Sequence, residues 1–302
     1  MSAGTVRIGT RGSTLALWQA RWVADRLRAE LPDRDIELVP VTTRGDVHAG
    51  PLTGSAGEIG FFTSEIEAAL IDGRVDLAVH SLKDLPTADQ ARLPVVAVPL
   101  RHDPADVLVG RDGLTLERLP RSARVGTSSP RRTCLVRSRR PDLEIAPLRG
   151  NVDTRVKKVE AGEYDAIVLA MAGVARLGLE RVVTERFDPA AFPPAPGQGA
   201  LAVQVGETGG AVAEALARLD DEAARSATAA ERACLQELGG GCARPIGAYA
   251  RAVAAGLELT AFVGAEDGSR VVRAVGTGAD PETVGRAVAA ELFERGAGDL
   301  LP

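Results

Sequence analysis

The chain has 302 residues, of which 45% are hydrophobic and 25% charged, and its formal net charge is −5 at pH 7. This composition is typical of a globular protein of two or three domains, and the acidic balance argues against a nucleic-acid-binding surface, which is normally basic. No apolar run approaches the roughly 20 residues of a membrane span, and no apolar segment follows a basic N-terminus, so we expect a cytoplasmic protein with neither membrane nor nucleic acid as partner.

The first predicted elements are a strand at 6–10 and a helix at 13–31. Apolar residues recur in the helix at every third or fourth position, and Ser13 stands where an N-cap is expected. A strand, a helix and a second strand follow at 36–43, 62–73 and 75–81. Strands that alternate with helices predict an α/β unit with a largely parallel sheet.

Two short patterns recur further along the chain. RIGTRGS (7–13) returns as RVGTSS (124–129), and GRVDLAV (73–79) returns as GEYDAIV (162–168). Two echoes in the same order predict two similar α/β lobes. In such folds a ligand binds outside the carboxyl ends of the strands, where helix N-termini offer unpaired N–H groups, so we expect a cleft between the lobes.

Arginine and serine side chains gather at these strand ends. They are Arg11, Ser13, Arg131, Arg132, Arg149, Arg155 and Arg176. A single surface arginine contributes only about 0–1 kcal/mol to an ion pair. A partly buried, bidentate contact to a carboxylate contributes roughly 1.5–3 kcal/mol, so arginines that recur at one topological location predict a site for several carboxylates or phosphates.

The pattern changes after PPAPGQGALAVQV (193–205), which we interpret as a crossover back into the first lobe. A long helix at 220–240, strands at 257–263 and 269–276, and a helix with Asp280 as N-cap predict a small α+β domain. The expected domains are therefore a first lobe, a second lobe and a C-terminal domain, at 1–100 with 196–218, at 101–195 and at 219–302.

The chain has three cysteines and three histidines, and none of them stands at a metal-ligand spacing. An odd number of cysteines also makes a disulfide framework improbable in a cytoplasmic protein. We interpret Cys134 and Cys234 as core side chains, whereas Cys242 lies in the glycine-rich stretch GGGCARPIG (239–247). Consecutive glycines indicate a bare loop, so we expect the Cys242 thiol to be accessible.

HSLKDLP (80–86) is a second candidate for chemistry, because Lys83 and Asp84 directly follow a predicted strand. A strand-end salt bridge would explain this pair equally well. Cys242, His80 and Asp84 would also make a hydrolase triad. That interpretation requires an exposed His80, and a histidine at the end of an apolar strand is more often structural.

The following motifs run in order over nearly the whole chain: RIGTRGSTLALWQA, VTTRGD, AVHSLKDLP, VGTSSPRR, LRGNVDTR, YDAIVLAMAG, APGQGAL, AERACLQELGGGCARPIG and VGAEDGS. Together they resemble the porphobilinogen deaminase family. The resemblance implies two lobes similar to periplasmic binding proteins, with mixed, largely parallel sheets, and a small C-terminal α+β domain. It also implies a monomer that joins four porphobilinogen molecules into hydroxymethylbilane and releases ammonia, in tetrapyrrole (haem) biosynthesis.

The resemblance further implies a covalent dipyrromethane cofactor, bound by a thioether to Cys242. Asp84 matches the family's catalytic carboxylate, which stabilises the cation left by loss of ammonia and transfers protons. Positions that match cofactor contacts are Lys83, Ser129, Arg131 and Arg132. Positions that match contacts to substrate or the growing chain are Arg11, Ser13, Gln19, Arg149, Arg155 and Arg176. Asp46 matches a further family position.

Two features depart from the family pattern. The segment GSAGEIGFF (54–62) matches a mobile lid that often carries lysine but has none here, and Pro130 stands where leucine is usual. A different class also remains open, because two lobes around an anion-binding cleft describe a non-catalytic solute-binding protein. Cys242 in a third domain has no purpose in such a protein.

Overall fold

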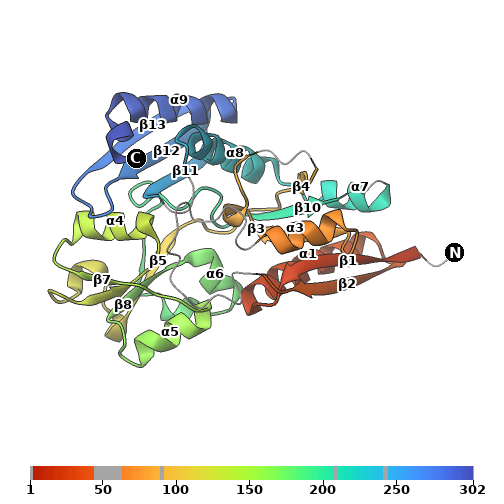
Figure 1. Ribbon diagram of the computed structural model, residues 1–302, viewed down its shortest axis with the longest axis horizontal. Coiled ribbons are helices and arrows are strands. Elements are labelled where there is room, and N and C mark those ends of the chain that lie inside the picture. Colours follow the sequence, from red (N-terminus) through yellow and green to blue (C-terminus); the bar gives the residue numbers. More distant parts are fainter. Residues whose placement is uncertain (1–2, 44–62, 89–91, 207–209, 241–243, 302) are drawn as a thin grey trace. The chain divides into compact units, whose positions relative to one another are not determined.

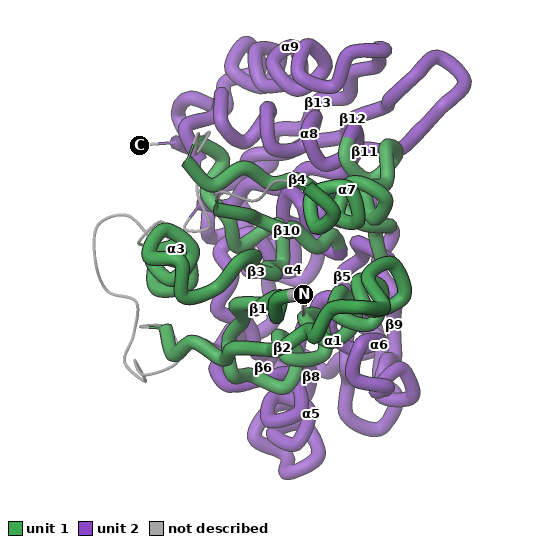
Figure 2. Tube along the Cα trace, turned by 90° about the vertical axis from the view of Figure 1, so that its right-hand side faces the viewer, with its two compact units in different colours: residues 1–102, 200–225 green, residues 103–199, 226–302 purple. Residues whose placement is uncertain are grey.

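The computed structural model describes residues 3–43, 63–88, 92–206, 210–240 and 244–301. The chain divides into two compact units, and each is described by itself (Figure 2). Unit 1 comprises residues 1–102 and 200–225, and unit 2 comprises residues 103–199 and 226–302. In the described part of the chain, every helix is too short or too polar to span a membrane.

Unit 1 is built on a five-stranded sheet of order β2-β1-β3-β10-β4 (Figure 1). The strands are β1 (Ala3–Arg11), β2 (Arg34–Val41), β3 (Leu77–Ser81), β4 (Val95–Ala97) and β10 (Leu201–Val205). β1 is parallel to β2 and β3, whereas β10 is antiparallel to β3 and β4. The helices are α1 (Thr14–Glu30), α3 (Ser64–Ile71) and α7 (Ala211–Ala217). Apolar residues of α1, such as Val23 and Leu27, form one core with Ile8 of β1.

Unit 2 contains a second five-stranded sheet, of order β7-β6-β8-β5-β9. The strands are β5 (Asp106–Gly110), β6 (Arg124–Gly126), β7 (Glu144–Ala146), β8 (Ala166–Ala170) and β9 (Glu185–Arg186). β6 is parallel to β7 and β8, whereas β5 is antiparallel to β8 and β9. The helices are α4 (Pro130–Arg139), α5 (Val152–Glu160) and α6 (Met171–Arg176).

The two sheets have equivalent topology. In each, the second strand in order is parallel to both neighbours and the fourth is antiparallel to the third. The repeated sequence patterns fall at equivalent places, because RIGTRGS includes the end of β1 and RVGTSS includes β6, and the second echo contributes β3 and β8. The prediction of two similar α/β lobes is therefore confirmed.

A third, antiparallel sheet of order β11-β12-β13 forms the C-terminal part of unit 2. Its strands are β11 (Ile246–Val253), β12 (Gly256–Gly264) and β13 (Val271–Gly278), and its helices are α8 (Glu222–Glu237) and α9 (Pro281–Glu294). Figure 1 shows α9 lying along this sheet, and both helices share a core with it. Asp280 caps α9 by accepting a hydrogen bond from Thr283 N at 2.9 Å. The predicted small α+β domain is confirmed, although sequence reasoning missed β11.

The small sheet packs directly against the second lobe within unit 2. Phe262 of β12 shares a core with Leu135 and Phe192. A Cβ atom at Gly264 would overlap the sulfur of Cys134, so only glycine permits this close approach. Cys134 and Cys234 are fully buried, and burial raises the pKa of these thiols to about 11 and about 12. Both cysteines are thus inert core side chains, as predicted.

Candidate functional site

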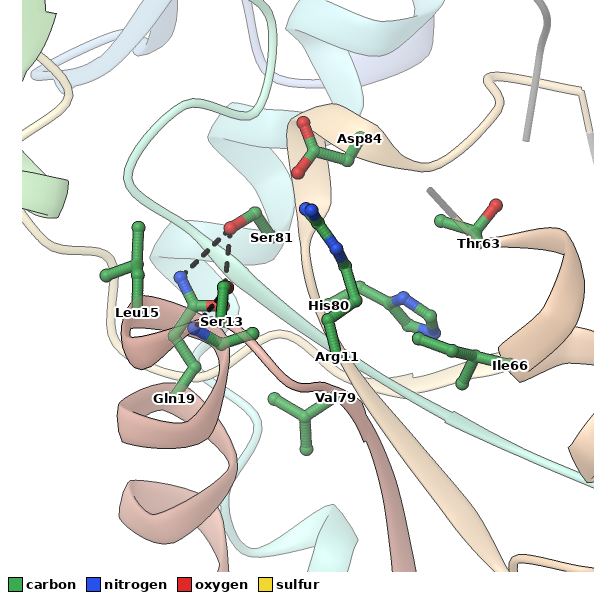
Figure 3. A pocket seen from close by; sticks show the side chains of 11 residues that line it. Arg11, Ser13, Leu15, Gln19, Thr63, Ile66, Val79, His80, Ser81 and Asp84 are labelled. Atoms are coloured by element: carbon green, nitrogen blue, oxygen red, sulfur yellow. Dashed lines mark hydrogen bonds between the residues drawn. The ribbon is translucent and has the colours of Figure 1, made fainter. Parts of the chain in front are cut away.

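A pocket in unit 1 lies where β1 and β3 end (Figure 3). β1 ends at Arg11, and Ser13 caps α1 by accepting a hydrogen bond from Ala16 N at 3.3 Å. Because parallel neighbouring strands end at the same edge of a sheet, these side chains meet those at the end of β3. The lining residues are Arg11, Ser13, Leu15, Ala16, Gln19, Thr63, Ile66, Val79, His80, Ser81 and Asp84. Arg11, Ser13, Gln19 and Asp84, predicted from the sequence, therefore line one pocket.

Gln19 and Ser81 bind each other on one wall of this pocket. Gln19 is only 3% exposed, and its Nε2 donates a hydrogen bond to Ser81 Oγ at 3.0 Å (Figure 3). This bond fixes the end of β3 to α1 across 62 positions of sequence. Sequence reasoning did not single out Ser81, although its place between His80 and Lys83 at a strand end was a usable signal.

Asp84 closes the short 3-10 turn Leu82–Asp84 that follows β3. Its side chain is half-buried, and within the described residues its carboxylate takes part in no hydrogen bond or ion pair. Arg11 extends toward this carboxylate in Figure 3. Leu85 is extended, with φ −81° and ψ 142°, as expected for a residue before proline. The carboxylate of Asp84 thus faces the pocket. Within the described residues it does not form the strand-end salt bridge that would also have explained the sequence.

His80 is the buried member of this group, with 5% of its surface exposed. Burial lowers the pKa of His80 to about 4, and the neighbouring Gln204 side chain opposes this shift only partly. The imidazole is consequently neutral at pH 7 and is not the exposed base that a hydrolase triad requires. This burial agrees with a structural role for His80.

Unit 2 carries a second group of predicted residues, in the first turn of α4. Ser129 caps this helix by accepting a hydrogen bond from Arg132 N at 3.4 Å, and Pro130 occupies the first helical position. Arg131 and Arg132 are 3% and 8% exposed. Nη1 of Arg131 and Nη2 of Arg132 each lie 2.7 Å from an oxygen of Asp106, which is fully buried.

Asp106 is the functional candidate that sequence reasoning missed. Burial alone would raise its pKa, but the charges and hydrogen bonds of Arg131 and Arg132 outweigh burial and hold the pKa well below its ordinary range. Gln198, which is 1% exposed, donates from Nε2 to Asp106 Oδ1 at 2.9 Å. Gln198 belongs to APGQGAL, which was interpreted as part of a crossover and as a family motif, and this motif was the available signal.

Three further predicted arginines lie in unit 2. Arg155 is half-buried and donates from Nε to Gly150 O at 2.7 Å. Burial, followed by the positive charges of Arg132 and Arg149, lowers the pKa of Arg155 to about 10. Arg132, Arg149 and Arg155 therefore form a cluster of like charge. Arg176 is 7% exposed, burial lowers its pKa to about 10, and its Nη2 donates to Gly199 O at 2.7 Å.

Lys83 is half-buried beside Asp84. Cys242, Asp46 and the predicted lid at 54–62 lie outside the described residues, so the structure does not describe their surroundings. Among the residues it does describe, no group of three or more histidine, cysteine or acidic side chains could hold a metal ion. Among the described site residues, the chemical groups are the half-buried carboxylate of Asp84, the buried carboxylate of Asp106 and several arginines.

Comparison with protein families gives two matches in series. Residues 6–214 match the model described as porphobilinogen deaminase, dipyromethane cofactor binding domain, and residues 226–294 match porphobilinogen deaminase, C-terminal domain. The chain belongs to the porphobilinogen deaminase family. The family resemblance inferred from the motifs is thereby confirmed.

Relatives within the porphobilinogen deaminase family match almost from end to end. The porphobilinogen deaminase of Mycolicibacterium paratuberculosis is 49% identical over 307 residues, which cover 98% of this chain and 96% of that protein. That of Roseiflexus castenholzii is 48% identical, with 98% of each chain covered. Among solved structures, a probable amino-acid ABC transporter extracellular-binding protein from Bacillus subtilis has a TM-score of 0.43 at 12% identity, covering 72% of this chain and 90% of that one.

Proposed function

We propose that this member of the porphobilinogen deaminase family joins four porphobilinogen molecules into linear hydroxymethylbilane and releases ammonia. The observation that carries this proposal is the match to both family domains, in order and over 6–214 and 226–294. The pocket with Asp84 and the arginine cluster of unit 2 support it, because they supply a carboxylate and anion-binding groups.

The arginine cluster is chemically suited to a dipyrromethane cofactor, whose acetate and propionate groups are anions. The positive charges of Arg132 and Arg149 lie close enough to Arg155 to disfavour its protonated form, so a resident anion would stabilise this group. We assign the holding of the cofactor to Lys83, Ser129, Arg131 and Arg132, with Cys242 as its thioether anchor. When bound, the cofactor supplies the terminal pyrrole carbon to which the first substrate is joined.

We assign Asp84 the role of charge stabiliser and proton carrier. Its carboxylate faces a pocket and has no partner in the described chain, so it is available to a cation that develops when the amine of the substrate leaves. Carboxylate groups of the substrate and growing chain are assigned to Arg11, Ser13, Gln19, Arg149, Arg155 and Arg176. A guanidinium suits this task because it offers a planar fork of donors to each carboxylate.

We propose a cytoplasmic monomer with domains at 1–100 with 196–218, 101–195 and 219–302. The rival function, a solute-binding protein, shares the anion-binding groups but has no use for a catalytic carboxylate.

The test is turnover of porphobilinogen by the purified protein. We expect one ammonia released for each porphobilinogen consumed and one hydroxymethylbilane formed for every four. Tight binding of porphobilinogen without ammonia release would contradict the proposed function and favour the solute-binding alternative.

A further inference from the structure

The guanidinium of Arg132 is held by three of its own N–H groups. Nε and Nη2 donate to Asp106 Oδ1 at 3.1 and 2.7 Å, and Nη1 donates to the carbonyl oxygen of Val168 at 2.9 Å. A guanidinium has five N–H donors, one on Nε and two on each terminal nitrogen. In the described part of the chain, one N–H on Nη1 and one on Nη2 therefore have no acceptor. One N–H on each terminal nitrogen can together bind a carboxylate in a bidentate manner.

Asp106 is itself fixed from the opposite side. Gln198 Nε2 donates to Asp106 Oδ1 at 2.9 Å and to Pro104 O at 2.7 Å, and Gln198 is 1% exposed. Both residues are buried, so this arrangement has little freedom to rotate. The orientation of Arg132 thus depends on two contacts between residues that are distant in the sequence. Arg132 and Asp106 are 26 positions apart, and Asp106 and Gln198 are 92 positions apart.

The positive charge of Arg132 acts on a neighbouring arginine even though Arg132 is paired with Asp106. Asp106 is shared by Arg131 and Arg132. The charge of Arg132 is still felt at Arg155, whose protonated form it disfavours. An anion that joins these like charges would stabilise them, so this place favours an anionic ligand.

We propose that Asp106, supported by Gln198, is a positioning residue that turns the terminal N–H pair of Arg132 toward a carboxylate of the bound ligand. The ligand class is a carboxylate-bearing pyrrole, so the inference rests on the proposed function. Asp106 acts only through the arginines and does not itself touch the ligand.

A double-mutant cycle in the full-length chain tests this role. Asp106→Asn, Arg132→Lys and the double variant are compared in a Cys242→Ser background, with glutarate as the probe and sodium chloride at equal ionic strength as reference. The stabilisation of the melting temperature by glutarate gives its affinity. Because charge-assisted hydrogen bonds are involved, we expect Asp106→Asn to weaken glutarate binding roughly tenfold. The double variant should bind glutarate no more weakly than Arg132→Lys alone.

The matched control is Asp103→Asn. Asp103 forms an ion pair of the same kind, with Arg186 Nε at 2.6 Å and Nη2 at 2.8 Å. We expect this variant to bind glutarate as the reference does. A second variant, Gln198→Met, keeps every charge and should weaken glutarate binding by a factor of about three, since it removes one hydrogen bond to Asp106. If Asp106→Asn does not fold, the glutarate affinity of Gln198→Met tests the positioning role of Asp106.

Unchanged glutarate affinity in Asp106→Asn or, failing that variant, in Gln198→Met would overturn the proposal. So would additive losses in the double variant, because additivity means that Asp106 does not act through Arg132. A further readout is the fraction of chains with an intact Cys242 that carry a two-pyrrole adduct, which should fall in Asp106→Asn and not in Asp103→Asn. If the wild type carries no adduct, the proposed function fails, whereas the glutarate cycle still decides the role of Asp106.

Discussion

Replacing Asp84 with asparagine removes one negative charge and changes almost nothing in shape. Asp84 is half-buried in a pocket and has no ion pair in the described chain, so an effective dielectric constant of about 20 is appropriate. A cation about 4 Å from the carboxylate is then stabilised by roughly 4 kcal/mol. Loss of that energy from the transition state corresponds to a decrease in rate of about three orders of magnitude.

The assay for Asp84→Asn is the initial rate of ammonia release at saturating porphobilinogen, on protein whose adduct has been verified by intact mass. We expect kcat to fall about a thousandfold. Asp76→Asn is the matched control, because Asp76 is a carboxylate of the same unit that pairs with Arg7 at 2.8 Å. It should keep its kcat. A kcat for adduct-bearing Asp84→Asn within tenfold of the wild type would refute the electrostatic reasoning.

Three further predictions concern stability. Glu231 is fully buried and accepts hydrogen bonds from Gly197 N at 2.8 Å and Ala250 N at 2.9 Å, so Glu231→Gln should lower the free energy of unfolding by about 2 kcal/mol in urea titrations. Gly247→Ala should lower the melting temperature, because a Cβ there would overlap the carbonyl oxygen of Pro193, and an unchanged value would contradict this packing. Burial lowers the pKa of His80 from 6.5 to about 4, so the unfolded chain takes up this proton first as pH falls. The contribution of neutral His80 to the free energy of unfolding is therefore fully present above pH 6.5, and about 3 kcal/mol of it is lost as the pH falls to 4. In His80→Gln, the free energy of unfolding should not show this loss between pH 6.5 and 4.

Elements with strong periodicity could be predicted from the sequence, and weakly patterned ones could not. The helix from Thr14 was predicted because Ser13 is a good cap and apolar residues repeat at helical spacing. The strand Ile246–Val253 was missed because its sequence IGAYARAV is dominated by alanine and glycine, which favour strands weakly. Its place in the sheet depends on pairing with β12, which no local pattern reveals.

The candidate site was predictable where it lies at strand ends. Arg11, Ser13 and Asp84 follow predicted strands, and topology brings such positions to one edge. Asp106 was not predictable, because its ion pairs link residues 26 positions apart and only the fold brings them together. Arg131 and Arg132 were predicted as cofactor-binding residues, and the structure adds that both are buried and paired with Asp106, which the sequence did not reveal.

The central claim is that Cys242 anchors a cofactor made of two linked pyrroles. It is tested most directly by the intact mass of the purified protein after incubation with porphobilinogen, measured for the wild type and for Cys242→Ser. We predict that the wild type carries a covalent addition equivalent to two linked pyrroles and that Cys242→Ser carries none. A wild type without the addition, or an equal addition on Cys242→Ser, would contradict the claim.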